Sequence, residues 1–214
     1  MPKTLKSFHE NHKSAHTISM KKLQHQPDFS KLCKPAQNHI LDIASLLIFF
    51  FFVASITGFL WEVLIFLVKE GRFRNRGFLY GPWLPVYGIG AVLFFVLLCK
   101  KKSHPLTVFL LSLFIGTGLE LVIGWFLDTW WGLRYWDYTT YFLNFHGYIC
   151  LFSAAGFGIA GTIWICLLST PLKKLWFLLP VRLRRALNTI LILLFVTDCA
   201  AALIFPNTGK GVTF

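Results

Sequence analysis

The chain has 214 residues, of which 56% are hydrophobic, 17% are aromatic and only 14% are charged. Soluble globular domains carry roughly a quarter charged residues, so this composition excludes an ordinary soluble domain. The net charge of +12 does not indicate nucleic-acid binding, because the basic residues lie between apolar segments rather than in one patch. The composition therefore predicts an all-α, polytopic integral membrane protein in contact with the lipid bilayer.

The sequence divides into three parts. Residues 1–38 contain seven lysines and show no apolar periodicity, so we expect a disordered basic cytoplasmic tail. Residues 39–206 contain all the long apolar stretches and form the predicted transmembrane helical domain. Residues 207–214 form a short C-terminal tail.

Five apolar stretches predict about five transmembrane helices, since a membrane core needs about 20 apolar residues per helix. They cover residues 40–68, 83–99, 105–127, 149–170 and 187–205. The second and the fifth stretches are short. Pro82 and Pro85 suit the start of a helix, and we expect Pro105 and Pro171 to mark further helix boundaries.

The segment between the fourth and fifth stretches, residues 171–186, mixes leucine and tryptophan with five basic residues. This composition is typical of an interfacial segment lying on anionic lipid. A docking segment for a cytosolic ATPase is the alternative interpretation.

The basic residues are unequally divided between the two sides of the predicted bundle. Because successive helices alternate in direction, residues 1–38, Lys100–Lys102 and residues 171–186 share one side, with fifteen Lys and Arg residues against six on the other. The positive-inside rule then predicts a cytoplasmic N-terminus. The connection 69–82 is an exception, with four basic residues on the outer side. Either its arginines fold back onto acidic groups, or the number of spans is wrong by one.

Three acidic residues lie inside predicted spans, where charges are costly and usually face the bundle interior. Glu62, Glu120 and Asp198 are each six or seven residues from the same end of a span. At 1.5 Å per residue, all three should lie about 9–11 Å below the outer edge. Small residues that favour close helix packing flank the two glutamates at helical spacing: Ser55, Gly58, Ser112, Gly116 and Gly124.

The two outer connections are rich in aromatic and polar residues. An aromatic belt accounts for several of the tryptophans, but not for the charged and amide side chains between them. We therefore predict a polar cluster near the outer face, in which at least one arginine folds toward Glu62 and Glu120. Its candidate residues are Glu62, Arg72, Arg74, Arg76, Tyr80, Glu120, Arg134, Trp136, Asp137, Tyr138, Asn144 and Asp198.

This cluster has three interpretations. It could bind an amphipathic or zwitterionic solute, or it could hold a lipid phosphate while Glu120 or Asp137 performs acid–base chemistry. The third interpretation is a network that only ties loops to helices. Whether Asp198 belongs to the cluster stays open.

The five cysteines show no CxxC or zinc-like spacing, so we expect inert thiols and no metal site. A disulfide between Cys150 and Cys199 stays open, because both can lie toward the same side of the membrane. No residue pattern indicates a cofactor.

Three motifs on the outer side carry a family resemblance. They read GFLYGPWLPVYG at 77–88, GTGLELVIGW at 116–125 and WDYTTYFLNFHGYICL at 136–151. They resemble the bacterial family labelled "Putative ABC-transporter type IV", or CmpB-like permeases, over about residues 45–168. The resemblance implies a multi-pass protein of the bacterial cytoplasmic membrane. Its motif positions are Glu62, Arg76, Gly77, Tyr80, Gly81, Pro82, Tyr87, Gly88, Glu120, Trp136, Asp137, Tyr138, Asn144 and Gly147.

The sequence departs from the family pattern at Tyr148, where a basic residue is expected, so a direct ion-pair role at that position is doubtful. The resemblance predicts a permease-like component of a transport system. The sequence contains no Walker A motif, so ATP hydrolysis would need a separate ATPase subunit. Five spans are few for a pore, which favours a homo-oligomer. The alternatives are a membrane-embedded enzyme acting on a lipid or envelope precursor, and a regulatory or structural membrane protein.

Overall fold

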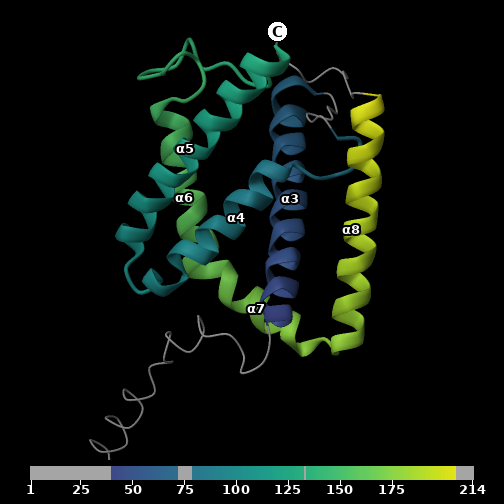
Figure 1. Cartoon of the computed structure of the whole chain (residues 1–214). Helices are drawn as coiled ribbons and strands as arrows, with labels where there is room; N and C mark the ends of the chain where they lie inside the picture. Colours follow the sequence, from purple (N-terminus) through teal and green to yellow (C-terminus); the bar gives the residue numbers. More distant parts are fainter. Residues whose placement is uncertain (1–39, 72–78, 133, 206–214) are drawn as a thin grey trace, which may run out of the picture.

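The structure is a computed structural model that describes residues 40–71, 79–132 and 134–205. All regular elements in these residues are helices, which confirms the predicted all-α membrane bundle (Figure 1). In chain order they are α3 (Ile40–Glu70), α4 (Pro85–Leu98), the short 3₁₀ helix η1 (Cys99–Lys101), α5 (Pro105–Trp131), α6 (Leu151–Thr162), the π-helix η2 (Ile163–Leu168), α7 (Ser169–Leu178) and α8 (Val181–Ile204). The two predicted tails and Arg72, Arg74 and Arg76 lie outside the described residues.

Four helical segments are long and apolar enough to cross a membrane: Ile40–Val68, Pro105–Trp130, Leu151–Leu178 and Val181–Ile204. The predicted second span is shorter than expected. Helix α4 has 14 residues, or about 21 Å at 1.5 Å per residue, against a hydrocarbon core of about 30 Å. Its first residue is Pro85, which agrees with the predicted proline start.

The missing length of the second span is supplied by residues 79–84, which enter the bundle without helical structure. The Leu84 N–H donates to the carbonyl of Ser55, halfway along α3, at 3.1 Å. Figure 1 accordingly shows α4 beginning beside the middle of α3 and running obliquely to the end where α3 begins. Non-helical backbone at membrane depth is tolerated only where the protein satisfies its polar groups, so this segment needs partners from neighbouring helices.

The predicted boundary at Pro171 is wrong, because the helix that begins at Leu151 continues to Leu178. The π-helical turn η2 lies immediately before this proline. A proline inside an α-helix removes one hydrogen bond and clashes with the preceding turn, and a π-turn is one of the few local rearrangements that accommodate such a defect. Figure 1 shows the chain changing direction between α6 and α7.

That the segment 171–186 lies on anionic lipid stays a prediction. The segment forms the end of α7 and the start of α8, which are separated at Pro180. Its Arg184 is buried and donates to Asp42 of α3 at 3.2 Å. Nearby, Asn188 donates to the carbonyl and hydroxyl of Ser45, both at 3.0 Å. These contacts attach the beginning of α8 to the beginning of α3.

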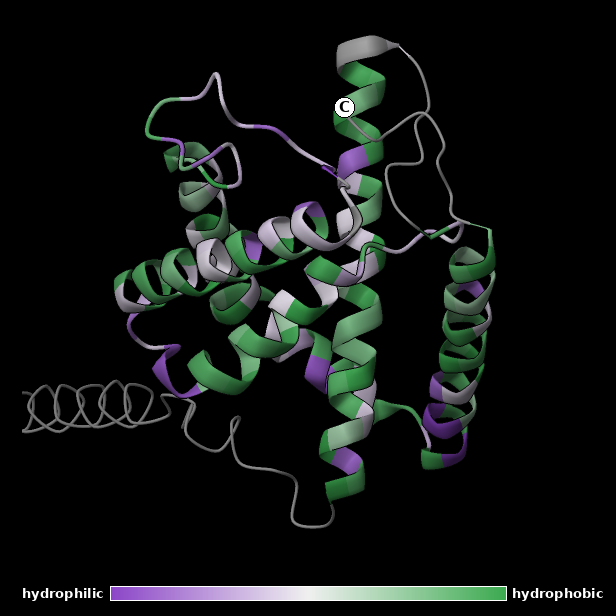
Figure 2. Cartoon of the chain, turned by 45° about the horizontal axis from the view of Figure 1, so that its top comes forward, coloured by the Kyte–Doolittle hydropathy of each residue, from purple (hydrophilic) through white to green (hydrophobic). Residues whose placement is uncertain are grey.

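Lys102 donates to the Thr170 hydroxyl, so η1 and α7 meet at one end of the bundle. This end, which we call the basic end, holds Lys100–Lys102 and residues 173–185, as the alternation of helix direction predicted (Figure 1). The opposite end carries residues 134–150, which we call the loop end. Figure 2 shows hydrophobic residues along most of the helical surface and hydrophilic residues mainly at helix ends and in the connections.

The apolar core lies toward the basic end, between α3, α4, α5 and the helix formed by α6, η2 and α7. Phe50, Val108 and Ile165 are completely buried there. Trp176 stacks on Phe49 with ring centroids 4.4 Å apart, and the Trp164 indole donates to the Ala91 carbonyl at 3.0 Å. This core fixes the helices that carry the polar residues of the loop end.

Candidate functional site

Glu120 lies in the interior of the bundle on α5, with only 7% of its surface exposed. The Tyr138 hydroxyl donates to its Oε1 at 3.1 Å. Its Oε2 is buried and has no hydrogen-bond partner among the described residues. The Ser153 side chain of α6 lies beside the carboxyl group. Glu120 therefore points inward, as the small-residue stripe on α5 predicted.

That stripe is the reason why α5 can bring Glu120 so close to its neighbours. Gly116, one turn before Glu120, packs against Phe157 of α6, and a Cβ at this position would lie 2.5 Å from the phenyl ring. Gly124, one turn after Glu120, packs against the Trp136 indole, where a Cβ would be 3.1 Å away. Larger residues at these two positions would separate α5 from α6 and from the loop.

Glu62 of α3 is the second inward carboxylate, and it also binds a tyrosine. The Tyr87 hydroxyl of α4 donates to Glu62 Oε1 at 2.7 Å. The Tyr87 ring lies directly on Gly58, where any Cβ would overlap it. The Ser55–Gly58–Glu62 stripe therefore allows close packing, as predicted. Because Gly58 has no side chain, the Tyr87 ring can lie against α3, and its hydroxyl reaches the Glu62 carboxylate.

Tyr138 is the loop residue that binds Glu120. Burial raises the pKa of its phenol above the usual range, Glu120 raises it further, and Cys150 and Glu62 add smaller contributions of the same sign. The Tyr138 hydroxyl bonds directly to Glu120, whereas Glu62 makes the smallest of these contributions. With its pKa raised, Tyr138 stays a neutral hydrogen-bond donor. The proximity of Glu62 and Glu120 stays a prediction.

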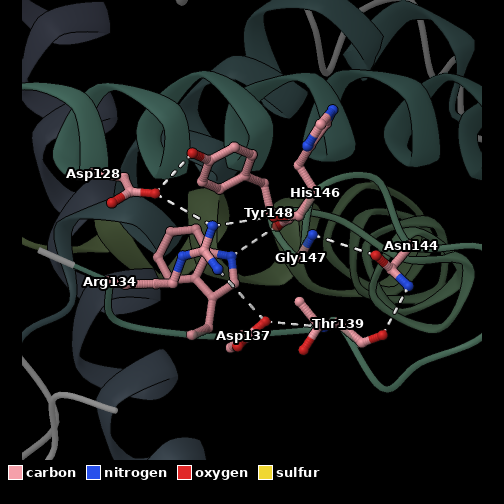
Figure 3. A network of polar contacts seen from close by, with 9 residues as sticks. Asp128, Arg134, Asp137, Thr139, Asn144, His146, Gly147 and Tyr148 are labelled. Carbon is pink, nitrogen blue, oxygen red and sulfur yellow. Dashed lines mark hydrogen bonds and ion pairs between the residues drawn. The ribbon is translucent and has the colours of Figure 1, made fainter. Parts of the chain in front are cut away.

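The loop of residues 134–150 covers the loop end of α5 and α6 and is organised around Arg134 (Figure 3). Arg134 donates to Asp128 at 3.2 Å and to the His146 carbonyl at 3.1 Å, and it lies 3.8 Å from Asp137. Its guanidinium also stacks over the Tyr148 ring at 4.9 Å. Arg134 therefore binds the acids of the loop end and does not fold toward Glu62 and Glu120, as one of the predicted arginines was expected to do.

Tyr148, the position that departs from the family pattern, belongs to this network as well. Its hydroxyl donates to Asp128 at 2.7 Å, and its backbone carbonyl accepts from the Trp136 indole at 2.7 Å. A tyrosine can thus bind Asp128 by a hydrogen bond where a basic residue would form an ion pair.

The remaining polar residues of the loop hold its backbone. Asn144 donates to the carbonyls of Thr139 and Tyr141, both at 3.0 Å, and accepts from the Gly147 N–H at 3.3 Å. Gly147 has a φ of +72° and packs so tightly that a Cβ would lie 2.5 Å from Asp137 Oδ1, so glycine is needed there for both reasons. The Thr139 N–H donates to Asp137 at 2.9 Å and is the main cause of its lowered pKa. Asp137 therefore stays ionised and already accepts a hydrogen bond from the Thr139 N–H. Both properties disfavour Asp137 as an acid–base catalyst.

Asp198 of α8 has a different set of partners, which all belong to the non-helical segment. Its Oδ1 accepts from the Tyr80 N–H at 3.0 Å, and its Oδ2 accepts from the Gly81 N–H at 2.9 Å and from the Trp83 indole at 2.6 Å. The Tyr80 hydroxyl in turn donates to the Phe205 carbonyl at 2.8 Å. Asp198 thus supplies the partners that residues 79–84 need at membrane depth.

The predicted polar cluster consequently separates into three groups. We use the name inner polar site for the two inward carboxylates, Glu62 and Glu120, with the tyrosines that bind them, Tyr87 and Tyr138, and the neighbouring Ser153. Arg134, Trp136, Asp137 and Asn144 organise the loop, and Tyr80 joins Asp198 at the non-helical segment. Tyr87 was identified only as a motif position, because no spacing rule relates a residue on α4 to Glu62. Cys150 and Cys199 are free thiols, so the open disulfide is not formed.

Residues 49–203 match the family described as "Putative ABC-transporter type IV". The chain belongs to this family. The match extends beyond residue 168, so that α8 and Asp198 fall inside the family region. No curated protein and no solved structure matched the chain significantly.

Membership of the "Putative ABC-transporter type IV" family and the four long apolar helices establish a multi-pass membrane protein. The family region includes both glutamates of the inner polar site, the loop of residues 134–150 and the non-helical segment 79–84. The residues of the inner polar site therefore lie within the family region, and their chemistry is the basis for a functional proposal.

Proposed function

We propose that the protein is the permease-like membrane component of an ATP-driven transport system of the bacterial cytoplasmic membrane, with its N-terminus in the cytoplasm. The family description names a transporter component. ATP would be hydrolysed by a separate ATPase chain, because the 214 residues contain no Walker A motif. The excess of Lys and Arg at the basic end supports a cytoplasmic location for that end.

One observation carries the proposal, namely the two inward carboxylates of the inner polar site. Carboxylates inside a membrane domain are costly, and those that persist usually mark a pathway for a substrate or an ion. Glu62 and Glu120 come from two different long helices, and each accepts a tyrosine hydroxyl. A site between several helices is also where membrane transport proteins can change contacts as the helices move. We propose that solute contacts this inner polar site.

The direct test is gentle extraction of the full chain, with an affinity tag, from its native membrane, followed by identification of the co-purifying proteins. The proposal expects an ATPase in stoichiometric amount and ATP hydrolysis by the complex in lipid vesicles. Glu120→Gln should retain the ATPase but lose transport in cells, whereas Trp130→Phe at the lipid-exposed end of α5 should retain both.

Other outcomes would overturn the proposal. If no ATPase accompanies the protein and the purified chain converts a lipid or envelope precursor, it is a membrane-embedded enzyme. If it neither binds an ATPase nor converts such a precursor, it is a regulatory or structural membrane protein.

A further inference from the structure

The hydrogen bonds around Glu120 leave one of its oxygens unexplained. Tyr138 donates to Oε1 at 3.1 Å, while Oε2 is buried without a partner among the described residues. An ionised carboxylate has two acceptor oxygens and no donor. A buried acceptor without a donor costs its full desolvation penalty, and the penalty is larger for a charged group. The geometry is therefore unfavourable for ionised Glu120.

The neighbouring hydroxyl cannot correct this deficit, because its hydrogen is already used. Ser153 Oγ donates to the Cys150 carbonyl at 3.0 Å and accepts from the Cys150 N–H at 3.2 Å, which caps the first turn of α6. A hydroxyl has one hydrogen and two lone pairs. The Ser153 hydroxyl therefore has no second hydrogen to offer to Glu120, and Oε2 stays without a donor among the described residues.

We infer that Glu120 is a proton-binding site, in which the buried Oε2 carries a proton at neutral pH. Protonation removes the negative charge from a carboxyl group that is only 7% exposed and whose Oε2 has no donor among the described residues, so the cost of burying the group falls. It also fits the available space, because the buried Oε2 admits no ion of the size of water, whereas a bound proton needs no added volume.

The titratable groups that act on this site come from the loop, α6 and α3. Tyr138 approaches from the loop, Cys150 and Ser153 from α6, and Glu62 acts on Tyr138 from α3. Among the residues that the structure describes, no cationic group acts on Glu120, and Arg134 is held by Asp128 and Asp137. Tyr138 reaches from the loop to Oε1, so proton exchange would take place toward the loop end. A role for this proton in a transport cycle rests on the proposed function, but the proton site itself does not.

Infrared spectroscopy of the purified full chain in lipid nanodiscs tests the inference directly. We expect, at neutral pH, the carbonyl stretching band of a protonated carboxylic acid, shifted in heavy water and by ¹³C-glutamate labelling. The label separates glutamates from aspartates, and the chain has only four glutamates: Glu10, Glu62, Glu70 and Glu120. The band should disappear in Glu120→Gln and persist in Glu62→Gln.

A second variant keeps the test decisive if Glu120→Gln does not fold. Replacing Glu10, Glu62 and Glu70 together by Gln leaves Glu120 as the only glutamate, and the labelled band should remain. Its absence from this variant, or a wild-type band that disappears with Glu62→Gln, would overturn the inference. Because the measurement needs neither ATP nor solute, its failure is distinguishable from failure of the proposed transport function.

Discussion

The most demanding prediction concerns Asp198, because one side chain satisfies three donors of the non-helical segment 79–84. Asp198→Ala removes the acceptor for the Tyr80 and Gly81 N–H groups and for the Trp83 indole. No other described side chain is bonded to these three donors. The substitution should therefore loosen the segment that completes the short second span, and with it the attachment of α8.

The magnitude follows from the number and type of the hydrogen bonds. A hydrogen bond to a charged group contributes about 1.5–3 kcal/mol. Because Asp198 is only half-buried, water can replace part of the loss, and we expect Asp198→Ala to lower the free energy of unfolding by about 4 kcal/mol. Asp198→Asn keeps one carbonyl oxygen that can serve the Oδ2 donors, so about 2 kcal/mol should be lost.

Reversible unfolding in mixed detergent micelles, followed by tryptophan fluorescence, measures these differences. The matched control is Thr197→Val, because Thr197 is the adjacent, exposed residue and its hydroxyl bonds only the Leu193 carbonyl of its own helix, at 2.8 Å. The control should change the stability by less than about 0.5 kcal/mol. If Asp198→Ala were no less stable than Thr197→Val, the carboxylate would not be supporting the segment, and the reasoning would be refuted.

Three further predictions concern the inner polar site and the loop. Gly116→Ala should destabilise the protein by about 1–3 kcal/mol because its Cβ would overlap Phe157, whereas Gly118→Ala, which meets nothing within 4 Å, should be neutral; equal unfolding midpoints would contradict close packing at position 116. Tyr138→Phe should cost about 1–3 kcal/mol by removing the donor to the buried glutamate, and unchanged denaturant stability would show that this bond is absent. Arg134→Gln should cost only about 1 kcal/mol, since its side chain is 30% exposed, but should accelerate amide hydrogen exchange throughout the loop; unchanged exchange would mean that the network does not hold the loop.

Much of the fold was predictable because a membrane imposes simple requirements on a sequence. The lengths of the apolar stretches indicated five helices, and the predicted helix start at Pro85 agrees with the first residue of α4. The residues at which the helices end were less predictable. The helix that passes Pro171 continues because a π-turn precedes the proline, and no sequence pattern announces such a turn.

The candidate site was predictable in part, for a related reason. Glu62 and Glu120 were expected to face inward because charged residues avoid lipid, and the small residues beside them indicated which face packs. The partners of these glutamates were not predictable. Tyr87 reaches Glu62 only because its ring lies on Gly58, and Arg134 binds acids of its own loop end rather than the glutamates. Such choices depend on distances between residues far apart in the sequence.

The sequence by itself determined that the chain is a helical membrane protein, which residues of its long helices face inward and to which family it belongs. These properties follow from composition, helical period and motif spacing, which are local. Only the tertiary structure decided that Asp198 supports a non-helical segment, that Tyr138 binds Glu120 while Tyr87 binds Glu62, and that Glu120 has an oxygen without a partner among the described residues. Hydrogen bonding is short-ranged and directional, so each of these outcomes depends on how the helices are placed against one another.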